Sequence, residues 1–86
     1  MVVSTLVVSN RRTKPLVVYV EPWAEDYTVI PGTEIKIEAY GNDDVLPRFV
    51  IVEWDDSIQV YCEETSDFNV FDGSQELKSG HNRQQN

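Results

Sequence analysis

Aspartate and glutamate are the residues of this 86-residue chain that could most readily do chemistry. Glu53, Asp55 and Asp56 lie close together, and Asp43 is followed directly by Asp44. Clustered carboxylates can bind calcium, and a pair of them can hydrolyse a glycosidic bond. The spacing matches no EF-hand loop or calcium-binding repeat, and so short a chain leaves little room for a catalytic cleft. We therefore predict solvated turn acids that serve binding, with no catalytic residue and no metal site.

Sulfur and imidazole ligands are also too few for a metal centre, because Cys62 and His81 are the only cysteine and histidine. The segment from Tyr27 to Ile37 looks like the strand, turn and strand that open many small copper-binding sandwiches. Copper sites of that type need two histidines and a cysteine, and zinc needs three or four nitrogen or sulfur ligands. We expect no cofactor, and we interpret Cys62 as a small buried hydrophobic residue.

The cellular compartment follows from the same scarcity of cysteine. A lone thiol argues against a disulfide framework and favours a reducing compartment. The first ten residues carry no basic charge, and Ser4 and Thr5 interrupt their apolar run. This is not the pattern of a signal peptide, and a membrane span needs about 20 apolar residues. We therefore expect a cytoplasmic protein without a membrane partner.

The two tryptophans occupy different sequence contexts. Trp54 ends an apolar run that contains Val50 and Val52, and the simplest interpretation places it in the core. Trp23 follows Glu21-Pro22 outside any expected strand and is flanked by acids. An indole in that position is either a contact for a partner or a plug that closes one end of the fold. The sequence leaves both interpretations of Trp23 open.

Charge is distributed unevenly along the chain, whose net charge is −8. All fifteen acids lie within residues 21–76, where Lys36 and Arg48 are the only bases, so this stretch carries −13. Such a field repels nucleic acid and attracts a basic protein. The basic group of Arg11, Arg12 and Lys14 is too small for a nucleic-acid footprint, and we interpret it as a solvated turn or an internal counter-charge.

The elements that must position these residues are β-strands, because apolar and polar residues alternate with a period of two. Ile35 and Ile37 alternate with charged residues, and Asp55-Asp56 has the length of a tight hairpin loop between residues 48–54 and 57–62. Further strands are predicted at residues 2–9, 15–21, 27–30 and 68–71. Six or seven strands in so short a chain predict one small antiparallel β-sandwich or small barrel.

Turn residues divide these strands. Pro31-Gly32 is a candidate type II turn, and Asp72-Gly73 closes the strand before it. Residues 1–76 are therefore predicted to form the β-sandwich domain. Residues 77–86 contain one apolar side chain, Leu77, and are predicted to form a disordered polar tail.

A resemblance supports the sandwich. The pattern of Asn10, then Glu21-Pro22-Trp23, Tyr27 and Pro31-Gly32 resembles small bacterial all-β proteins of unassigned function. It covers about the first third of the chain. The resemblance implies the fold and brings no catalytic residues with it.

These features favour a non-enzymatic binding or accessory protein, a monomer or a homodimer, that recognises a basic protein through its acidic face or its sheet edges. The residues predicted to bind are Trp23, Asp43, Asp44, Glu53, Asp55 and Asp56. One alternative is an inhibitor or immunity-type protein that blocks a basic active site. The other is a small-ligand-binding β-domain with a pocket lined by Trp23, Tyr27 and Tyr40.

Overall fold

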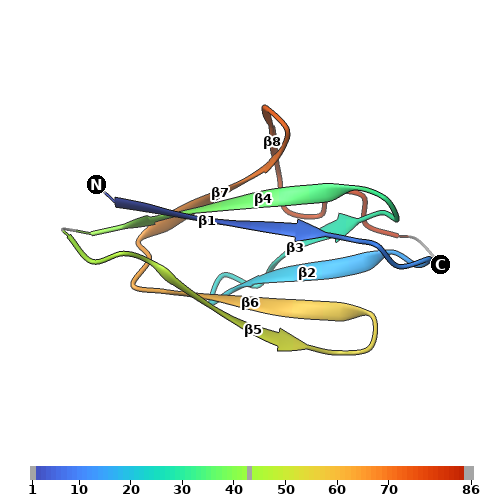
Figure 1. Cartoon of the computed structure of the whole chain (residues 1–86), viewed down its shortest axis with the longest axis horizontal. Helices are drawn as coiled ribbons and strands as arrows, with labels where there is room; N and C mark the ends of the chain where they lie inside the picture. The colour runs from blue at the N-terminus through green and yellow to red at the C-terminus, as the bar shows by residue number, and fades with distance from the viewer. Residues whose placement is uncertain (1, 43, 85–86) are drawn as a thin grey trace.

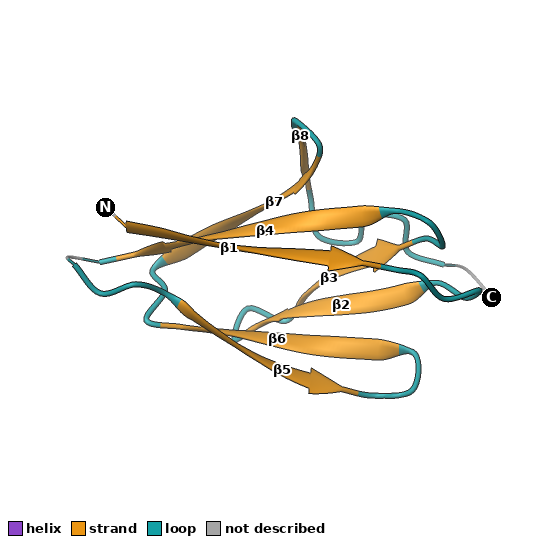
Figure 2. Cartoon of the chain, viewed as in Figure 1, coloured by secondary structure: helices purple, strands orange, loops and turns teal. Residues whose placement is uncertain are grey.

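The computed structural model describes residues 2–42 and 44–84, and the described chain is all-β (Figure 2). Its eight strands are β1 (Val2–Ser9), β2 (Leu16–Glu21), β3 (Glu25–Val29), β4 (Glu34–Gly41), β5 (Arg48–Glu53), β6 (Ser57–Glu63), β7 (Asp67–Asp72) and β8 (Gln75–Leu77). No stretch of the described chain forms a helix that could cross a membrane.

The strands form two four-stranded sheets that pack against each other (Figure 1). Sheet A has the order β1-β4-β7-β8 and is antiparallel throughout. Sheet B has the order β3-β2-β6-β5, and its central pair β2 and β6 is parallel. The all-β prediction is confirmed. The structure has eight strands where six or seven were predicted, and the β2–β6 pair is parallel where only antiparallel pairing was predicted. Local alternation shows where strands lie and does not show which strands pair.

The core between the sheets follows the period-two pattern. Val18 and Val20 of β2 and Ile37 of β4 are fully buried, and Val60 of β6 joins them from the centre of sheet B. Cys62 is buried in the same cluster, as predicted. Because alternate residues point to opposite faces, the remaining residues of these strands form the two outer faces of the sandwich.

The turn between β3 and β4 is the one that the sequence predicts. Gly32 has a φ of +81°, and the Thr33 amide donates to the Ile30 carbonyl over 3.1 Å. The predicted tight hairpin between β5 and β6 is also present, and the Trp54 amide donates to the Ser57 carbonyl at 2.8 Å. The Pro31-Gly32 turn is specified locally, because few residue pairs adopt its backbone angles, and the hairpin follows from the short loop between two strand patterns.

The C-terminal segment differs from its prediction as a disordered tail. Leu77 is buried at the end of β8, a strand that the alternation pattern did not predict. The Gly80 amide donates to the Asp26 carbonyl, and the Thr28 amide donates to the His81 carbonyl, so residues 80–81 lie along the free edge of β3. Arg83 pairs with Asp26 at 2.6 Å. Backbone hydrogen bonds need no apolar side chains, so a prediction from hydrophobic composition could not detect the pairing of residues 80–81 with β3. Residues 85–86 lie outside the described residues.

Candidate binding surface

The acids predicted to bind a partner do not form one site. Glu53, Asp55 and Asp56 are exposed at the tip of the β5–β6 hairpin, where the Asp55 carbonyl accepts a hydrogen bond from the Arg12 guanidinium. Asp44 is exposed in the loop before β5 and thus at the opposite end of that strand. Asp43 lies outside the described residues. Within residues 2–42 and 44–84, no group of histidine, cysteine or acidic side chains could hold a metal ion.

Trp23 lies in the turn between β2 and β3, far along β2 from the acidic hairpin tip. Its ring packs on Phe68 of β7, with 4.6 Å between the ring centroids and 40° between the ring planes. The residue remains 36% exposed. Trp23 therefore joins sheet B to sheet A at its inner side while its outer side stays accessible.

Of the three aromatic residues considered for a ligand pocket, Trp23 and Tyr27 line the same hollow, and Tyr40 lies elsewhere. Tyr27 is buried, and its hydroxyl donates to Glu25. Burial, with the hydrogen bond to Glu25, raises the pKa of Tyr27. Tyr40 lies on the outer face of sheet A, where its hydroxyl donates to Glu38 over 3.0 Å. Tyr40 therefore shares no pocket with Trp23 and Tyr27.

Cys62 is held in an unreactive form. Burial raises the pKa of the thiol to about 11. The thiolate is the nucleophile and the metal ligand of cysteine, and very little of it is present near neutral pH. The environment of Cys62 thus matches a packing role.

The interpretation of Trp54 as a core residue is wrong, because its side chain is 59% exposed. In the register of sheet B, Val52 lies beside Gln59, and Trp54 follows on the same outer face. The indole Nε1 donates to Gln59 Oε1 over 2.8 Å. The run from Arg48 to Trp54 is almost continuously apolar, so no alternation shows which of its side chains point inward. β5 is also an edge strand, and even the inward-facing Ile51 is 46% exposed.

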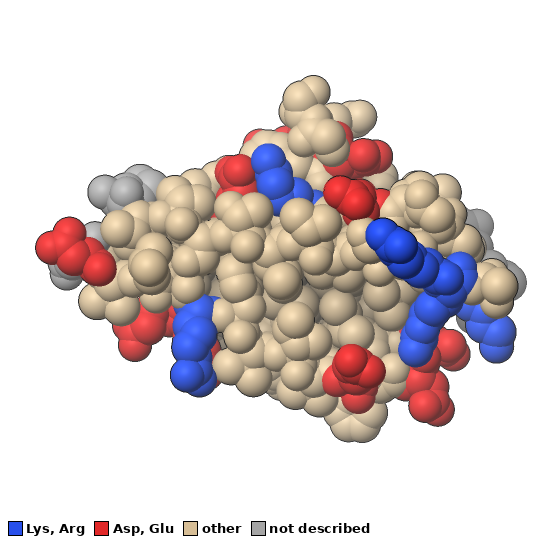
Figure 3. Space-filling view, in the orientation of Figure 1, with Lys and Arg blue, Asp and Glu red and all other residues tan. Residues whose placement is uncertain are grey.

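The side of the sandwich between the edge strands β1 and β5, called here the open side, carries the largest uncharged surface in view. Figure 3 shows this side, with charged side chains around a wide central area that has none. A groove of about 470 Å³ lies here, and apolar side chains of both sheets line it, among them Leu6, Ile51 and Ile58. The charged residues Arg11, Arg12 and Glu53 also contribute to its lining. Leu6 and Ile58 pack directly on the core. The groove therefore leads from solvent to the hydrophobic interior.

The four sheet edges are protected to different degrees. β8 has three residues, and β3 is covered by residues 80–81. β5 ends in charged residues, Arg48 and Glu53. β1 is eight residues long and contains no charge, proline or glycine. Natural proteins usually protect an edge strand by keeping it short, by covering it or by placing charged residues on it. β1 has none of these three forms of protection.

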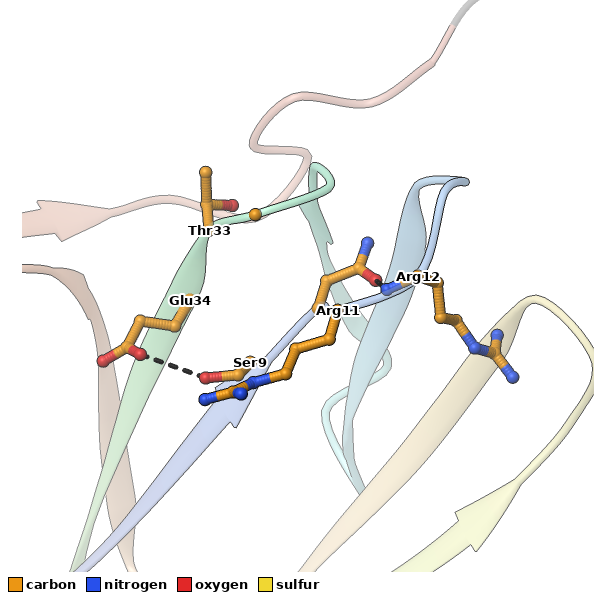
Figure 4. Close-up of a pocket in the computed structure, with 7 residues that line it drawn as sticks. Ser9, Arg11, Arg12, Thr33 and Glu34 are labelled. Atoms are coloured by element: carbon orange, nitrogen blue, oxygen red, sulfur yellow. Dashed lines mark hydrogen bonds between the residues drawn. The ribbon is translucent and has the colours of Figure 1, made fainter.

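Loops close the two ends of the open side. At one end, residues 44–47 lead into β5 of sheet B, and the Ser4 hydroxyl of β1 donates to the Pro47 carbonyl at 2.7 Å. At the other end lies a second hollow, whose polar lining Figure 4 shows. Ser9 donates to Glu34, and the Arg11 and Arg12 side chains point in opposite directions from the turn after β1. The basic residues predicted to form a solvated turn thus stand at one end of the groove.

Asn10 holds that turn in place. It is 1% exposed, and its amide nitrogen donates to the carbonyls of Lys14 and Val29, each at 2.8 Å. Its side-chain oxygen accepts from the Arg12 amide at 2.9 Å. Every polar atom of this buried side chain is thereby satisfied, and the start of β2 is fixed against the ends of β1 and β3.

The fold and this surface define a small protein of two packed four-stranded sheets with an unprotected edge strand. No family model, curated protein or solved structure matches the chain.

Proposed function

We propose that the protein is a non-enzymatic binding module that takes an extended segment of a basic protein along β1. The observation that carries this proposal is the open side: an uncharged eight-residue edge strand next to a groove to which both sheets contribute apolar side chains. Strand addition supplies affinity through main-chain hydrogen bonds, and pockets for alternate side chains supply specificity. Both requirements are present at β1.

The added strand would extend sheet A, and its side chains would alternate between two environments. Inward side chains would cover Leu6 and Ile51, which calls for apolar residues. Outward side chains would lie next to β1 and within reach of the outer face of β4, about two strand spacings or roughly 10 Å away. Glu34 and Glu38 stand on that face of β4. Glu38 is already paired with Lys36 at 3.2 Å, whereas Glu34 forms no ion pair among the described residues. The partner segment should therefore alternate apolar and basic residues.

Charge decides between a different protein and a second copy as the occupant. Two copies of a chain with a net charge of −8 repel each other, whereas a basic segment is attracted. Attraction between exposed charges is screened beyond about 8 Å at physiological ionic strength, so binding should weaken as salt rises. The inhibitor or immunity-type alternative shares this electrostatic preference, and it differs in requiring a folded basic active site as the target.

A synthetic peptide of alternating valine and lysine tests the proposal directly. We expect saturable shifts of backbone amide signals in β1 when the peptide is titrated into the labelled protein, and slower amide exchange along that strand. A peptide of alternating valine and glutamate should bind at least tenfold more weakly, because its charge is repelled.

Val7 and Val45 provide a matched pair of variants, because each is 51% exposed and only Val7 lies on β1. Val7→Lys should weaken binding of the basic peptide, and Val45→Lys should leave it nearly unchanged. Equal effects of both substitutions would show that only the overall charge matters and would overturn the assignment to β1. Sedimentation without peptide tests whether a second copy of the chain occupies β1 instead. A dimer that Val7→Lys dissociates would overturn the assignment of β1 to a basic partner.

A further inference from the structure

A second pocket lies on the outer face of sheet B, beside the open side. The aromatic residues Tyr19 and Trp54 line it. Ala24 and the polar residues Glu21, Ser57 and Gln59 complete the lining. Trp54 lines both this pocket and the groove of the open side. A partner seated along the groove would therefore meet this pocket at the same tryptophan.

The pocket is organised by a chain of side-chain hydrogen bonds that runs from the end of the β5–β6 hairpin across β6 to β2. Trp54 donates to Gln59 Oε1, and Gln59 Nε2 donates to Glu21 Oε2 over 3.0 Å. In the register of sheet B, Tyr19 lies directly opposite Gln59 on the neighbouring strand. The indole, the amide and the carboxylate thus have fixed positions before any ligand arrives, which lowers the entropic cost of binding.

The electrostatics of this pocket favour a cation. Tyr19 is 37% and Trp54 59% exposed, and the π-face of an aromatic ring attracts positive charge. Among the residues that the structure describes, Glu21 accepts a hydrogen bond only from Gln59 and forms no ion pair. The neighbouring basic side chain, Arg83, is already paired with Asp26. The pocket therefore combines two ring faces with a carboxylate that lacks a counter-charge.

We propose that this pocket binds the guanidinium group of an arginine side chain from the basic partner. A guanidinium has a flat face that stacks on aromatic rings and N–H donors that pair with a carboxylate. The net charge of −8 steers the cation toward the surface. This inference rests on the proposed function for its source of arginine, but the pocket itself does not involve β1.

N-acetyl-arginine amide is a suitable probe, and N-acetyl-citrulline amide has nearly the same shape without the charge. We expect the arginine compound to shift the indole N–H signal of Trp54 and the side-chain amide signals of Gln59 saturably at millimolar concentration. The citrulline compound should bind at least fivefold more weakly, because it lacks the charge that the rings and Glu21 recognise.

Glu21→Gln keeps an oxygen for the Gln59 hydrogen bond and removes the charge, so the fold should be preserved. We expect this variant to weaken binding of the arginine compound about fivefold or more. Glu76→Gln removes the same charge from an exposed position on β8 of sheet A and is the matched control. Equal weakening by both variants would mean that only the overall field attracts arginine, and the site assignment would be wrong.

Two further results separate this inference from its alternatives. If maltotriose shifts the same signals and the arginine compound does not, the pocket recognises glycans and the proposal is overturned. If Val7→Lys abolishes binding of the valine-lysine peptide and leaves the arginine shifts intact, both proposals stand. Failure of the peptide with retention of the arginine shifts would overturn the strand-addition function alone.

Discussion

Removal of the Asn10 side chain should cost this protein much of its stability. Asn10→Ala deletes three hydrogen bonds at 2.8, 2.8 and 2.9 Å and leaves the Val29 and Lys14 carbonyls and the Arg12 amide without these partners. At about 1 kcal/mol net for each bond, the loss is about 3 kcal/mol. A domain of this size has a total stability of roughly 4 to 13 kcal/mol. The melting temperature should therefore fall by roughly 12 to 24 °C.

Asn69→Ala is the matched control for this prediction. Asn69 donates one hydrogen bond, 3.1 Å long, to the hydroxyl of Tyr40 on the outer face of sheet A. Its removal should cost about 1 kcal/mol or less. Calorimetry and urea titration of both variants measure the difference. Similar losses for Asn10→Ala and Asn69→Ala would refute the idea that Asn10 fixes the turn after β1.

Asn10→Asp should make the stability at this position depend on pH. The ionised carboxylate turns an acceptor oxygen toward the Lys14 and Val29 carbonyls, where the amide nitrogen was a donor. This repulsion raises the pKa of the new carboxyl group in the folded state, so its penalty appears as pH rises through that value. The stability of Asn10→Asp relative to Asn10→Ala should therefore increase as the pH is lowered from 7 to 4. A pH-independent difference would show that the side chain has turned away from the carbonyls.

Three other predictions concern the packing around the sheets. Cys62 should react with a disulfide reagent at pH 8 far more slowly in the folded than in the urea-unfolded protein, because burial raises its pKa to about 11; equal rates would contradict its burial. The hydrogen bond and charge of Arg83 lower the pKa of Asp26 against the opposing effect of burial, and the resulting stabilisation is present at pH 7 and lost as pH falls through that lowered pKa. The difference in melting temperature between the wild type and Arg83→Gln should therefore shrink from pH 7 to pH 3, and a constant difference would argue against the ion pair. Gly41→Ala places a Cβ against the Val45 carbonyl oxygen and should lower the free energy of unfolding in urea by about 1–3 kcal/mol. The Cβ of Gly73→Ala meets no atom within 4 Å, so this variant should lose only the stability that the strain of its positive φ costs, about 1–2 kcal/mol.

The sequence by itself determines the local structure of this protein. Period-two alternation places β4 and points Ile35 and Ile37 inward, because successive strand residues face opposite sides. Pro31-Gly32 specifies its turn because few residue pairs adopt those backbone angles. The scarcity of histidine and cysteine argues against a zinc or copper centre on composition alone. These inferences need only the residue types and their order along the chain.

Only the tertiary structure decides which surface is available for binding. The acids that the sequence singles out at Asp55 and Asp44 stand at opposite ends of β5, and Trp54 lies on the outer face instead of in the core. The parallel pairing of β2 with β6 brings Tyr19 opposite Gln59, which is forty positions away in the chain, and both residues line the pocket beside Trp54. Which strands become edges depends on the order of strands within each sheet, and that order is set by the burial of all eight strands at once. No local pattern contains that information, because an edge strand and a central strand can have the same alternation and differ only in their neighbours.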